Sequence, residues 1–159
     1  MKFKTVAVGG TFDSLHKGHE ALLSKAFEVG EHVLIGLCSD NFVKMMRKPH
    51  PTAPYERRAR ELREFLRKKH FLERSKIVPL NDAYGPALTS NTLEALVVTK
   101  ETEMTAFEIN KRRKDSGLFP LHIVIIGLVS SEDNLPISTS RIHYGKIDRD
   151  GRLLKKCPK

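Results

Sequence analysis

The sequence is poor in cysteine and has no long run of apolar residues. Its 159 residues include two cysteines, Cys38 and Cys157, which lie far apart in the chain. So few cysteines exclude a dense disulfide framework, and we expect both to be free thiols in a reducing compartment. No apolar run approaches the roughly 20 residues that a helix needs to cross a bilayer, and the apolar stretch near the N-terminus is too short for a signal peptide. We therefore expect a cytoplasmic protein that does not bind membranes.

The chain also lacks internal repeats, low-complexity tracts and recognisable linkers. At 159 residues it is long enough to bury a hydrophobic core without support from metal ions or disulfides. Its content of 40% hydrophobic and 30% charged residues is that of ordinary globular proteins. These features predict a single domain that covers residues 1–159.

Acidic residues are outnumbered by basic ones. There are 28 Lys and Arg against 19 Asp and Glu, which gives a formal net charge of +9. A basic protein attracts polyanions, so nucleic acids and phosphorylated small molecules are both candidate partners. Much of the excess lies in residues 57–69, where Ala59, Leu62, Phe65 and Leu66 recur at helical spacing. This spacing predicts an amphipathic helix with its charges in solvent. Because the sequence also lacks the aromatic motif of RRM domains, we expect no nucleic-acid partner.

Short β-rich segments alternate with helical segments along the chain. Strands are predicted at residues 3–8, 32–38, 76–80, 93–98 and 121–128. Helices are predicted at residues 18–29, 55–70 and 104–116, with a final short helix from Ser138 and a turn at Asp150-Gly151. This alternation predicts an α/β protein, a single Rossmann-like domain whose five-stranded parallel sheet has helices on both faces. Ligands of such sheets bind at the carboxyl ends of the strands, where the strand order reverses.

The segment that follows the first predicted strand, residues 9–19, reads GGTFDSLHKGH. Its glycine spacing fits neither the GxGxxG dinucleotide motif nor the Walker A loop. The glycines let the backbone approach a ligand, and Thr11 offers a hydroxyl and an N–H group. His16 and His19 would share one face of the first turn of a helix, beside free backbone N–H groups and the positive end of the helix dipole. We interpret this segment as a polyphosphate site.

Two other interpretations of the histidine pair stay open at this point, namely half of a metal site or a pair of surface residues. A metal is disfavoured because no other cluster of His, Cys or carboxylate residues nearby supplies further ligands. We therefore predict that the protein itself holds no metal ion. Asp13 is predicted to fix the turn or to cap the helix.

A second cluster of hydroxyl groups lies near the C-terminus, at Ile137-Ser138-Thr139-Ser140-Arg141. Alone, such a cluster after a proline most often caps a helix. Hydroxyl and N–H groups at a helix start, followed by an arginine, also suit a phosphate group. Together with residues 9–19, this cluster would form the second half of a nucleotide site.

Both segments resemble known motifs. Residues 9–19 are similar to the GTFDxxHxGH signature of the nucleotidyltransferase superfamily, which includes the class I aminoacyl-tRNA synthetases, and residues 137–141 resemble its ISSTxxR motif. The resemblance implies that His19 stabilises the transition state at the α-phosphate, with His16 as a second catalytic residue. It implies a nucleotide-binding set of Gly10, Thr11, Phe12, His16, Lys17, Gly18, His19, Ser138, Thr139, Ser140 and Arg141. Mg²⁺ is expected to arrive with ATP, held mostly by phosphates and water.

Other segments narrow the choice within the superfamily. The chain is too short for a tRNA synthetase, it lacks the RTxG sequence that precedes the second motif in cytidylyltransferases, and Thr11-Phe12-Asp13 differs from nicotinamide-nucleotide adenylyltransferases. Residues 97–102 and 107–113, and Ser39-Asp40 leading to Arg47-Lys48-Pro49, resemble the archaeal and eukaryotic phosphopantetheine adenylyltransferases. This resemblance implies adenylyl transfer from ATP to 4′-phosphopantetheine, giving dephospho-CoA and pyrophosphate in coenzyme A biosynthesis. It places the second substrate against Thr11, Arg47 and Lys48.

The chain departs from the bacterial branch of that family in two places. Bacterial enzymes usually have threonine where this chain has His16, and an RGLR-like loop where it has residues 99–102. The bacterial pantetheine contacts therefore do not transfer to this sequence. FAD synthesis and cytidylyl transfer to glycerol phosphate or choline phosphate stay open as alternatives, and a basic RNA-binding protein is a remote one. The oligomeric state is not predicted.

Overall fold

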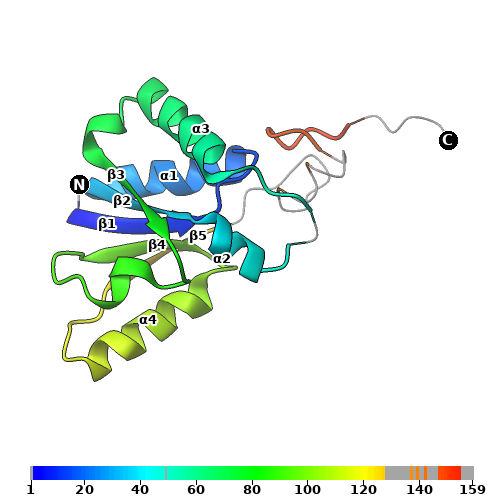
Figure 1. Cartoon of the computed structure of the whole chain (residues 1–159). Helices are drawn as coiled ribbons and strands as arrows, with labels where there is room; N and C mark the ends of the chain where they lie inside the picture. Colours follow the sequence, from blue (N-terminus) through cyan, green and yellow to red (C-terminus); the bar gives the residue numbers. More distant parts are fainter. Residues whose placement is uncertain are drawn as a thin grey trace.

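The fold is built around one parallel β-sheet. The computed structural model of the chain describes residues 2–48, 50–127, 137, 139, 142 and 147–154. Its sheet has five strands in the order β3-β2-β1-β4-β5, and every pairing between neighbours is parallel (Figure 1). The strands are β1 (Phe3–Gly10), β2 (Gly30–Cys38), β3 (Ser75–Leu80), β4 (Ala95–Thr99) and β5 (His122–Ile126). The predicted α/β class and five-stranded parallel sheet are confirmed.

Helices cover both faces of this sheet. Helices α1 (Lys17–Val29) and α3 (Tyr55–Lys68) lie on one face, and α4 (Glu103–Asp115) lies on the other with the 3₁₀ turn η2 (Gly85–Leu88) (Figure 1). Successive strand residues point to opposite faces, so the central strand β1 contributes to both cores. Val6 and Val8 pack with α1 and α3, while Ala7 packs with residues of α4.

Helix α3 is amphipathic as predicted, with one exception. Its apolar stripe is buried, but Arg58, expected among the solvent-exposed charges, has no exposed surface at all. Arg58 is four residues before Leu62 and seven before Phe65, so it lies on the same face of the helix as the apolar stripe. The expectation for Arg58 was wrong because backbone carbonyls at the edge of the sheet accept its hydrogen bonds, as described below.

Three short elements were not predicted, namely α2 (Asp40–Met45) and the 3₁₀ turns η1 (Leu72–Arg74) and η2 (Gly85–Leu88). The Ser39 side chain caps α2 by accepting a hydrogen bond from the N–H of Phe42 at 3.2 Å. A helix of six residues is too short to show a periodic apolar pattern, so the sequence gives no signal for it.

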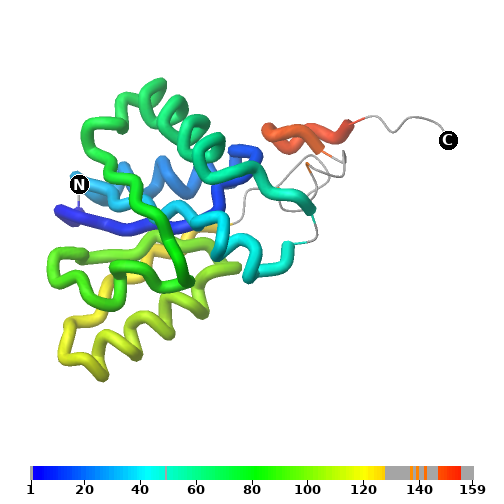
Figure 2. The backbone as a smooth tube through the Cα atoms, viewed as in Figure 1, coloured from blue at the N-terminus to red at the C-terminus, as the bar shows by residue number. Residues whose placement is uncertain are grey.

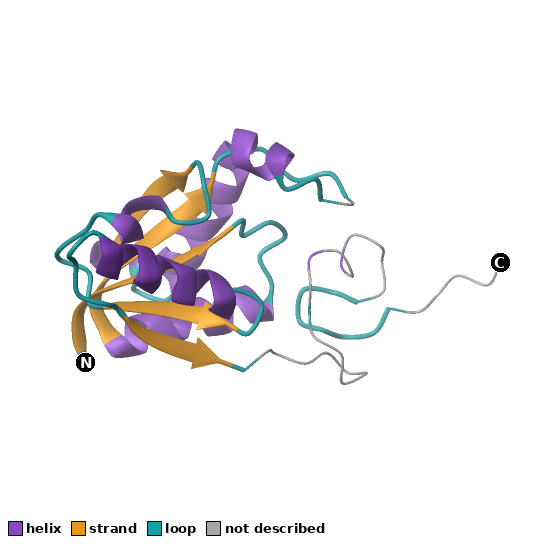
Figure 3. Ribbon diagram, turned by 90° about the horizontal axis from the view of Figure 1, so that it is seen from below, coloured by secondary structure: helices purple, strands orange, loops and turns teal. Residues whose placement is uncertain are grey.

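The described C-terminal residues 147–154 form a tight turn, shown in orange-red in Figure 2. Ile147 and Leu153 make an antiparallel bridge, and Gly151 has a φ of 82°, which confirms the turn predicted at Asp150-Gly151. The final helix predicted from Ser138 lies mostly outside the described residues. Figure 3 shows the strands running in one direction, with their carboxyl ends on the side of the molecule that holds this turn. Within the described residues, no helix has the length and apolar content to span a membrane.

Candidate active site

A cavity of about 650 Å³ lies at the carboxyl ends of the central strands, where the strand order reverses between β1 and β4. Its polar end is lined by Gly10, Thr11, His16, His19 and Lys48. The cavity therefore lies where the strand pattern predicts a ligand site.

The loop between β1 and α1 has a strained backbone. Phe12 and Ser14 have φ values of 50° and 48°, in the left-handed region that residues other than glycine seldom adopt. Phe12 is held there by burial, since its side chain is only 1% exposed and its ring lies 5.3 Å from that of His19. Strain of this kind costs about 1–3 kcal/mol per residue and concentrates at functional sites.

His16 is the N-cap of α1. Its Nδ1 accepts hydrogen bonds from the N–H groups of Gly18 at 3.0 Å and His19 at 3.3 Å. In return, Nδ1 of His19 accepts a hydrogen bond from the N–H of His16 at 3.2 Å, which completes a capping box made of two histidines. The two rings stack with their centroids 3.7 Å apart.

This geometry fixes how both imidazoles are protonated. Burial, and to a smaller extent the charge of Arg149, lowers the pKa of His16 from 6.5 to about 4. The pKa of His19 is also well below 6.5, first because of burial and then because of His16, Lys48 and Arg149. Both rings are therefore neutral at pH 7, and since each Nδ1 accepts a hydrogen bond, each Nε2 carries the proton. The pair presents two neutral N–H donors to a ligand.

The backbone N–H groups of the first turn of α1 are not free, contrary to the sequence-based expectation. The N–H of Lys17 donates to the carbonyl of Arg149 at 2.9 Å, and those of Gly18 and His19 donate to His16. The sequence missed this because histidine is not among the preferred capping residues and Arg149 is distant in the chain. The first turn of α1 therefore offers no free N–H group to a phosphate, unlike a helix end with uncapped donors.

Gly18 makes the capping geometry possible. A Cβ atom at this position would lie 2.8 Å from Cε1 and 2.9 Å from Nδ1 of His16. Any larger residue would thus push the His16 ring away from the helix N-terminus.

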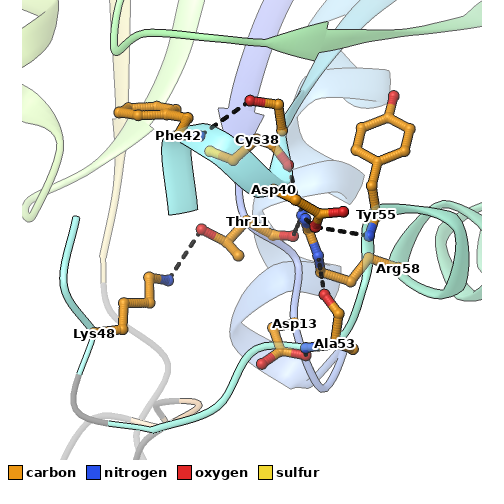
Figure 4. Close-up of polar contacts among 10 residues, drawn as sticks. Thr11, Asp13, Cys38, Asp40, Phe42, Lys48, Ala53, Tyr55 and Arg58 are labelled. Atoms are coloured by element: carbon orange, nitrogen blue, oxygen red, sulfur yellow. Dashed lines mark hydrogen bonds and ion pairs between the residues drawn. The ribbon is translucent and has the colours of Figure 1, made fainter. Parts of the chain in front are cut away.

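The two cations expected to bind the second substrate both line a neighbouring hollow, but they differ in their relation to this cavity. Lys48 lines the cavity, and its Nζ donates to Oγ1 of Thr11 at 3.0 Å (Figure 4). Burial lowers the pKa of Lys48. Arg47 is exposed and is not among the residues that line the cavity, and the same is true of Lys17. Lys48 is therefore the member of the Arg47-Lys48 pair that faces the site.

Arg58 holds together the loops that carry these residues. Its guanidinium donates to the carbonyls of Thr11 at 2.9 Å, Cys38 at 2.8 Å and Ala53 at 2.8 Å, and pairs with the Asp40 carboxylate at 3.0 Å (Figure 4). It thereby joins the loop after β1, the end of β2 and the segment before α3. Sequence reasoning missed this residue, although its place on the apolar stripe of α3 was a usable signal.

The second motif meets the first one at the cavity. Ile137 and Thr139 both line it, and Oγ1 of Thr139 donates to the carbonyl of Asp13 at 2.9 Å. Asp13 is buried and its Oδ1 accepts a hydrogen bond from the N–H of Ala53 at 3.3 Å, in keeping with the structural role predicted for it. Ser138, Ser140 and Arg141, predicted to bind the nucleotide, lie outside the described residues.

Comparison with known proteins places the chain in a family. The sequence model of the cytidylyltransferase-like family matches residues 7–144. A phosphopantetheine adenylyltransferase of Pyrococcus abyssi is 47% identical over 156 residues, which cover 98% of this chain and 99% of the relative. Another, from Methanothermobacter thermautotrophicus, is 43% identical over 155 residues, 98% of this chain and 92% of the relative. The chain belongs to the phosphopantetheine adenylyltransferase family.

The resemblance noted in the sequence is thus confirmed over nearly the whole chain. Among solved structures, a protein of unknown function from Archaeoglobus fulgidus is 32% identical, with a TM-score of 0.69, over 79% of this chain and 89% of that one. The TM-score supports a shared fold, while the curated relatives supply the family.

The described residues contain no group of three or more His, Cys, Asp or Glu side chains that could hold a metal ion. Cys38 is a buried free thiol at the end of β2, and burial raises its pKa. Cys157 lies outside the described residues. Besides His16, His19, Thr11 and Lys48, the polar lining of the cavity includes His50, Glu101, Thr102 and Thr105.

Proposed function

We propose that this chain transfers the adenylyl group of ATP to 4′-phosphopantetheine, giving dephospho-CoA and pyrophosphate in coenzyme A biosynthesis. The family supplies the reaction, and the observation that supports it at the site is the stacked pair His16–His19, neutral and with both Nε2–H groups left for a ligand. Two donors on one rigid helical turn suit the oxygens of a phosphoryl group.

The chemical step is an in-line displacement at the α-phosphorus of ATP. A phosphate oxygen of phosphopantetheine forms the new P–O bond, the bond from the α-phosphorus to the oxygen bridging to the β-phosphate breaks, and pyrophosphate leaves. No covalent bond to the protein forms. His19 donates to the α-phosphoryl oxygens as negative charge grows there, and His16 donates to the triphosphate beside it. Thr139, whose hydroxyl donates to the carbonyl of Asp13, lines the cavity at this end. Lys48, fixed against Thr11, meets the phosphate of the second substrate.

The other end of the cavity suits the pantetheine arm. There the walls come from β2, η2 and α4 and the loop before η2, and the lining is mostly apolar: Leu34, Ala83, Pro86, Ala87, Ala106 and Ile109. The pantetheine arm is uncharged, and its two amides, hydroxyl and thiol are separated by methyl and methylene groups, which fits a mostly apolar pocket with a few polar groups. We therefore place the phosphate of this substrate at Lys48 and its chain toward α4.

Magnesium would enter as part of the ATP complex. Since the described residues offer no cluster of ligands for it, the triphosphate and water would supply its coordination. Its chemistry there is charge neutralisation on the phosphates.

The test is a pyrophosphate-release assay in which ATP or CTP is paired with phosphopantetheine, FMN or glycerol phosphate. We expect turnover with ATP and phosphopantetheine, preferred over CTP by at least about tenfold, which corresponds to about 1.4 kcal/mol. Robust turnover of CTP with glycerol phosphate, and none with phosphopantetheine, would refute the proposal.

A further inference from the structure

Arg58 is fully buried, but it does not line the cavity. Its side chain has no exposed surface, and it is not among the residues that line the cavity or the neighbouring hollow. Its hydrogen bonds go to three backbone carbonyls and one carboxylate, which offset the cost of burying its charge. Any effect of Arg58 on a substrate must therefore pass through the groups that it binds.

Two of these groups are the ends of the segment that carries Lys48. The carbonyl of Cys38 lies at the end of β2, where this segment begins, and the carbonyl of Ala53 lies just before α3, where it ends. Arg58 donates to the first from Nη1 and to the second from Nε, each at 2.8 Å. Its Nη2 also pairs with Asp40, inside the segment, at 3.0 Å. One guanidinium thus closes the loop on which Lys48 lies.

The third carbonyl belongs to Thr11, whose hydroxyl accepts the hydrogen bond of Lys48. Nη1 of Arg58 donates to this carbonyl at 2.9 Å. The carbonyl is part of the peptide bond between Thr11 and Phe12, whose φ of 50° lies in the left-handed region. Such a conformation persists only where the surrounding structure holds it. Arg58 therefore fixes both the loop that carries Lys48 and the loop that carries its acceptor (Figure 4).

We propose that Arg58 is a positioning residue for the second substrate, because it holds the loops that place Nζ of Lys48 against Thr11 in the cavity. The inference rests on the proposed function, which assigns the phosphate of phosphopantetheine to Lys48. The ammonium group of a lysine is a single charge on a flexible stem, so its place depends on the backbone that carries it and on its acceptor. Arg58 sets both without contacting the substrate.

Arg58→Lys tests this inference, and Arg74→Lys is its matched control. Lysine keeps the positive charge, but its single nitrogen cannot reproduce the fork geometry with which a guanidinium binds three carbonyls. Arg74 also donates to three backbone carbonyls, but these lie at the end of α1 and the start of β2 and do not line the cavity.

The expected result is a change in one Michaelis constant. Arg58→Lys should raise the KM for phosphopantetheine about five- to tenfold, up to the value of the Lys48 contact itself, with a much smaller effect on the KM for ATP. Arg74→Lys should lower the melting temperature and leave both KM values unchanged.

The Lys48→Met background shows whether Arg58 acts through Lys48. There, Arg58→Lys should change the KM for phosphopantetheine by less than about twofold, because no amine is left to place, while its effect on the melting temperature persists. Asp40→Ala is a milder variant for the case that Arg58→Lys does not fold. It removes the carboxylate that pairs with Nη2, and more than half of the Asp40 side chain is exposed. It should raise the same KM about threefold.

Two outcomes of this assay would overturn the inference. An unchanged KM for phosphopantetheine in Arg58→Lys, or in Asp40→Ala where the former does not fold, would limit Arg58 to a role in stability. An undiminished rise of this KM in the Lys48→Met background would show that Arg58 acts by a route other than Lys48.

A second measurement needs no substrate and separates this inference from the proposed function. If the wild-type chain does not turn over phosphopantetheine, the proposed function fails, and acetylation of Lys48 by acetic anhydride still decides whether Arg58 positions it. Arg58→Lys should raise the rate of this acetylation, followed by peptide mass spectrometry, because Nζ is released from Thr11. Arg74→Lys should not, and equal rates in the wild type and Arg58→Lys would contradict the positioning role.

Discussion

Replacing His19 by asparagine separates two tasks that this side chain combines. Its Nδ1 accepts the N–H of His16 and so completes the cap of α1, while its Nε2–H is left for the α-phosphate. Asparagine places its amide oxygen near the position of Nδ1, but it has no group at the position of Nε2. His19→Asn therefore keeps the cap and removes the donor.

The expected magnitude follows from that difference. Loss of one preorganised donor to a transferring group costs about 100- to 1000-fold in kcat, or about 3–4 kcal/mol. Because the acceptor for the N–H of His16 stays, the free energy of unfolding should change by less than about 1 kcal/mol. His19→Gln is the reverse control, since its amide reaches the position of Nε2 but leaves the cap incomplete. It should retain more activity than His19→Asn and lose about 1 kcal/mol of stability.

The assay is pyrophosphate release with both substrates saturating, combined with urea unfolding of each variant. A kcat of His19→Asn within about threefold of wild type, or about 0.7 kcal/mol, would remove His19 from the chemical step. Equal losses of activity in the asparagine and glutamine variants, each with reduced stability, would show that the ring acts only as part of the helix cap.

Three further predictions concern stability, substrate affinity and the loop framework. His16 is neutral when folded, with a pKa of about 4 against 6.5, so the stability it contributes is fully present above pH 6.5 and is lost as the pH falls toward 4. Urea unfolding of His16→Asn should therefore show about 2 kcal/mol less loss between about pH 7.5 and about pH 5 than wild type, and an equal loss would contradict the low pKa. Lys48→Met should raise the KM for phosphopantetheine about tenfold, with a much smaller effect of Arg47→Met, and the reverse order would reassign the subsite. Arg58→Met should lower the free energy of unfolding by about 3 kcal/mol or more, measured with urea, because one buried and two partly buried carbonyls lose their donor, and a change below about 1 kcal/mol would contradict the proposed loop framework.

Much of the fold could be predicted because its strands have a strong local signal. The run HVLIGLC in β2 is nearly continuous in apolar residues, as expected for a strand covered on both faces. A first strand at the centre of the sheet places the residues at its carboxyl end, 9–19, at the expected ligand site. The predicted ends of the three long helices agree with the observed ones to within two residues, and the differences arise because caps rather than periodicity set those ends.

The parts that could not be predicted depend on contacts between distant segments. The sequence places Arg58 on the apolar stripe of its helix, but it does not show what Arg58 binds, because the carbonyls belong to distant segments whose positions the sequence does not give. Similarly, the sequence alone indicates a free N–H group at Lys17, because it does not show that the carbonyl of Arg149 accepts a hydrogen bond from it. Lys48 and Arg47 are adjacent in the chain, and the sequence alone cannot tell which of them faces the cavity.

The imidazoles and the lysine of the site are held in different ways, and this difference suits their different proposed roles. The two imidazoles lie at the start of helix α1. Each ring accepts a hydrogen bond from a backbone N–H group of this segment and the two rings stack, so their Nε2–H donors are held in place before substrate binds. Side chains on helices hold catalytic geometry more precisely than those on loops. Lys48 lies on a loop, where its hydrogen bond to Thr11 holds it at the edge of the cavity. The proposed function thus assigns the neutral, rigid donors to the reacting phosphorus of ATP and the charged lysine to the phosphate of the second substrate.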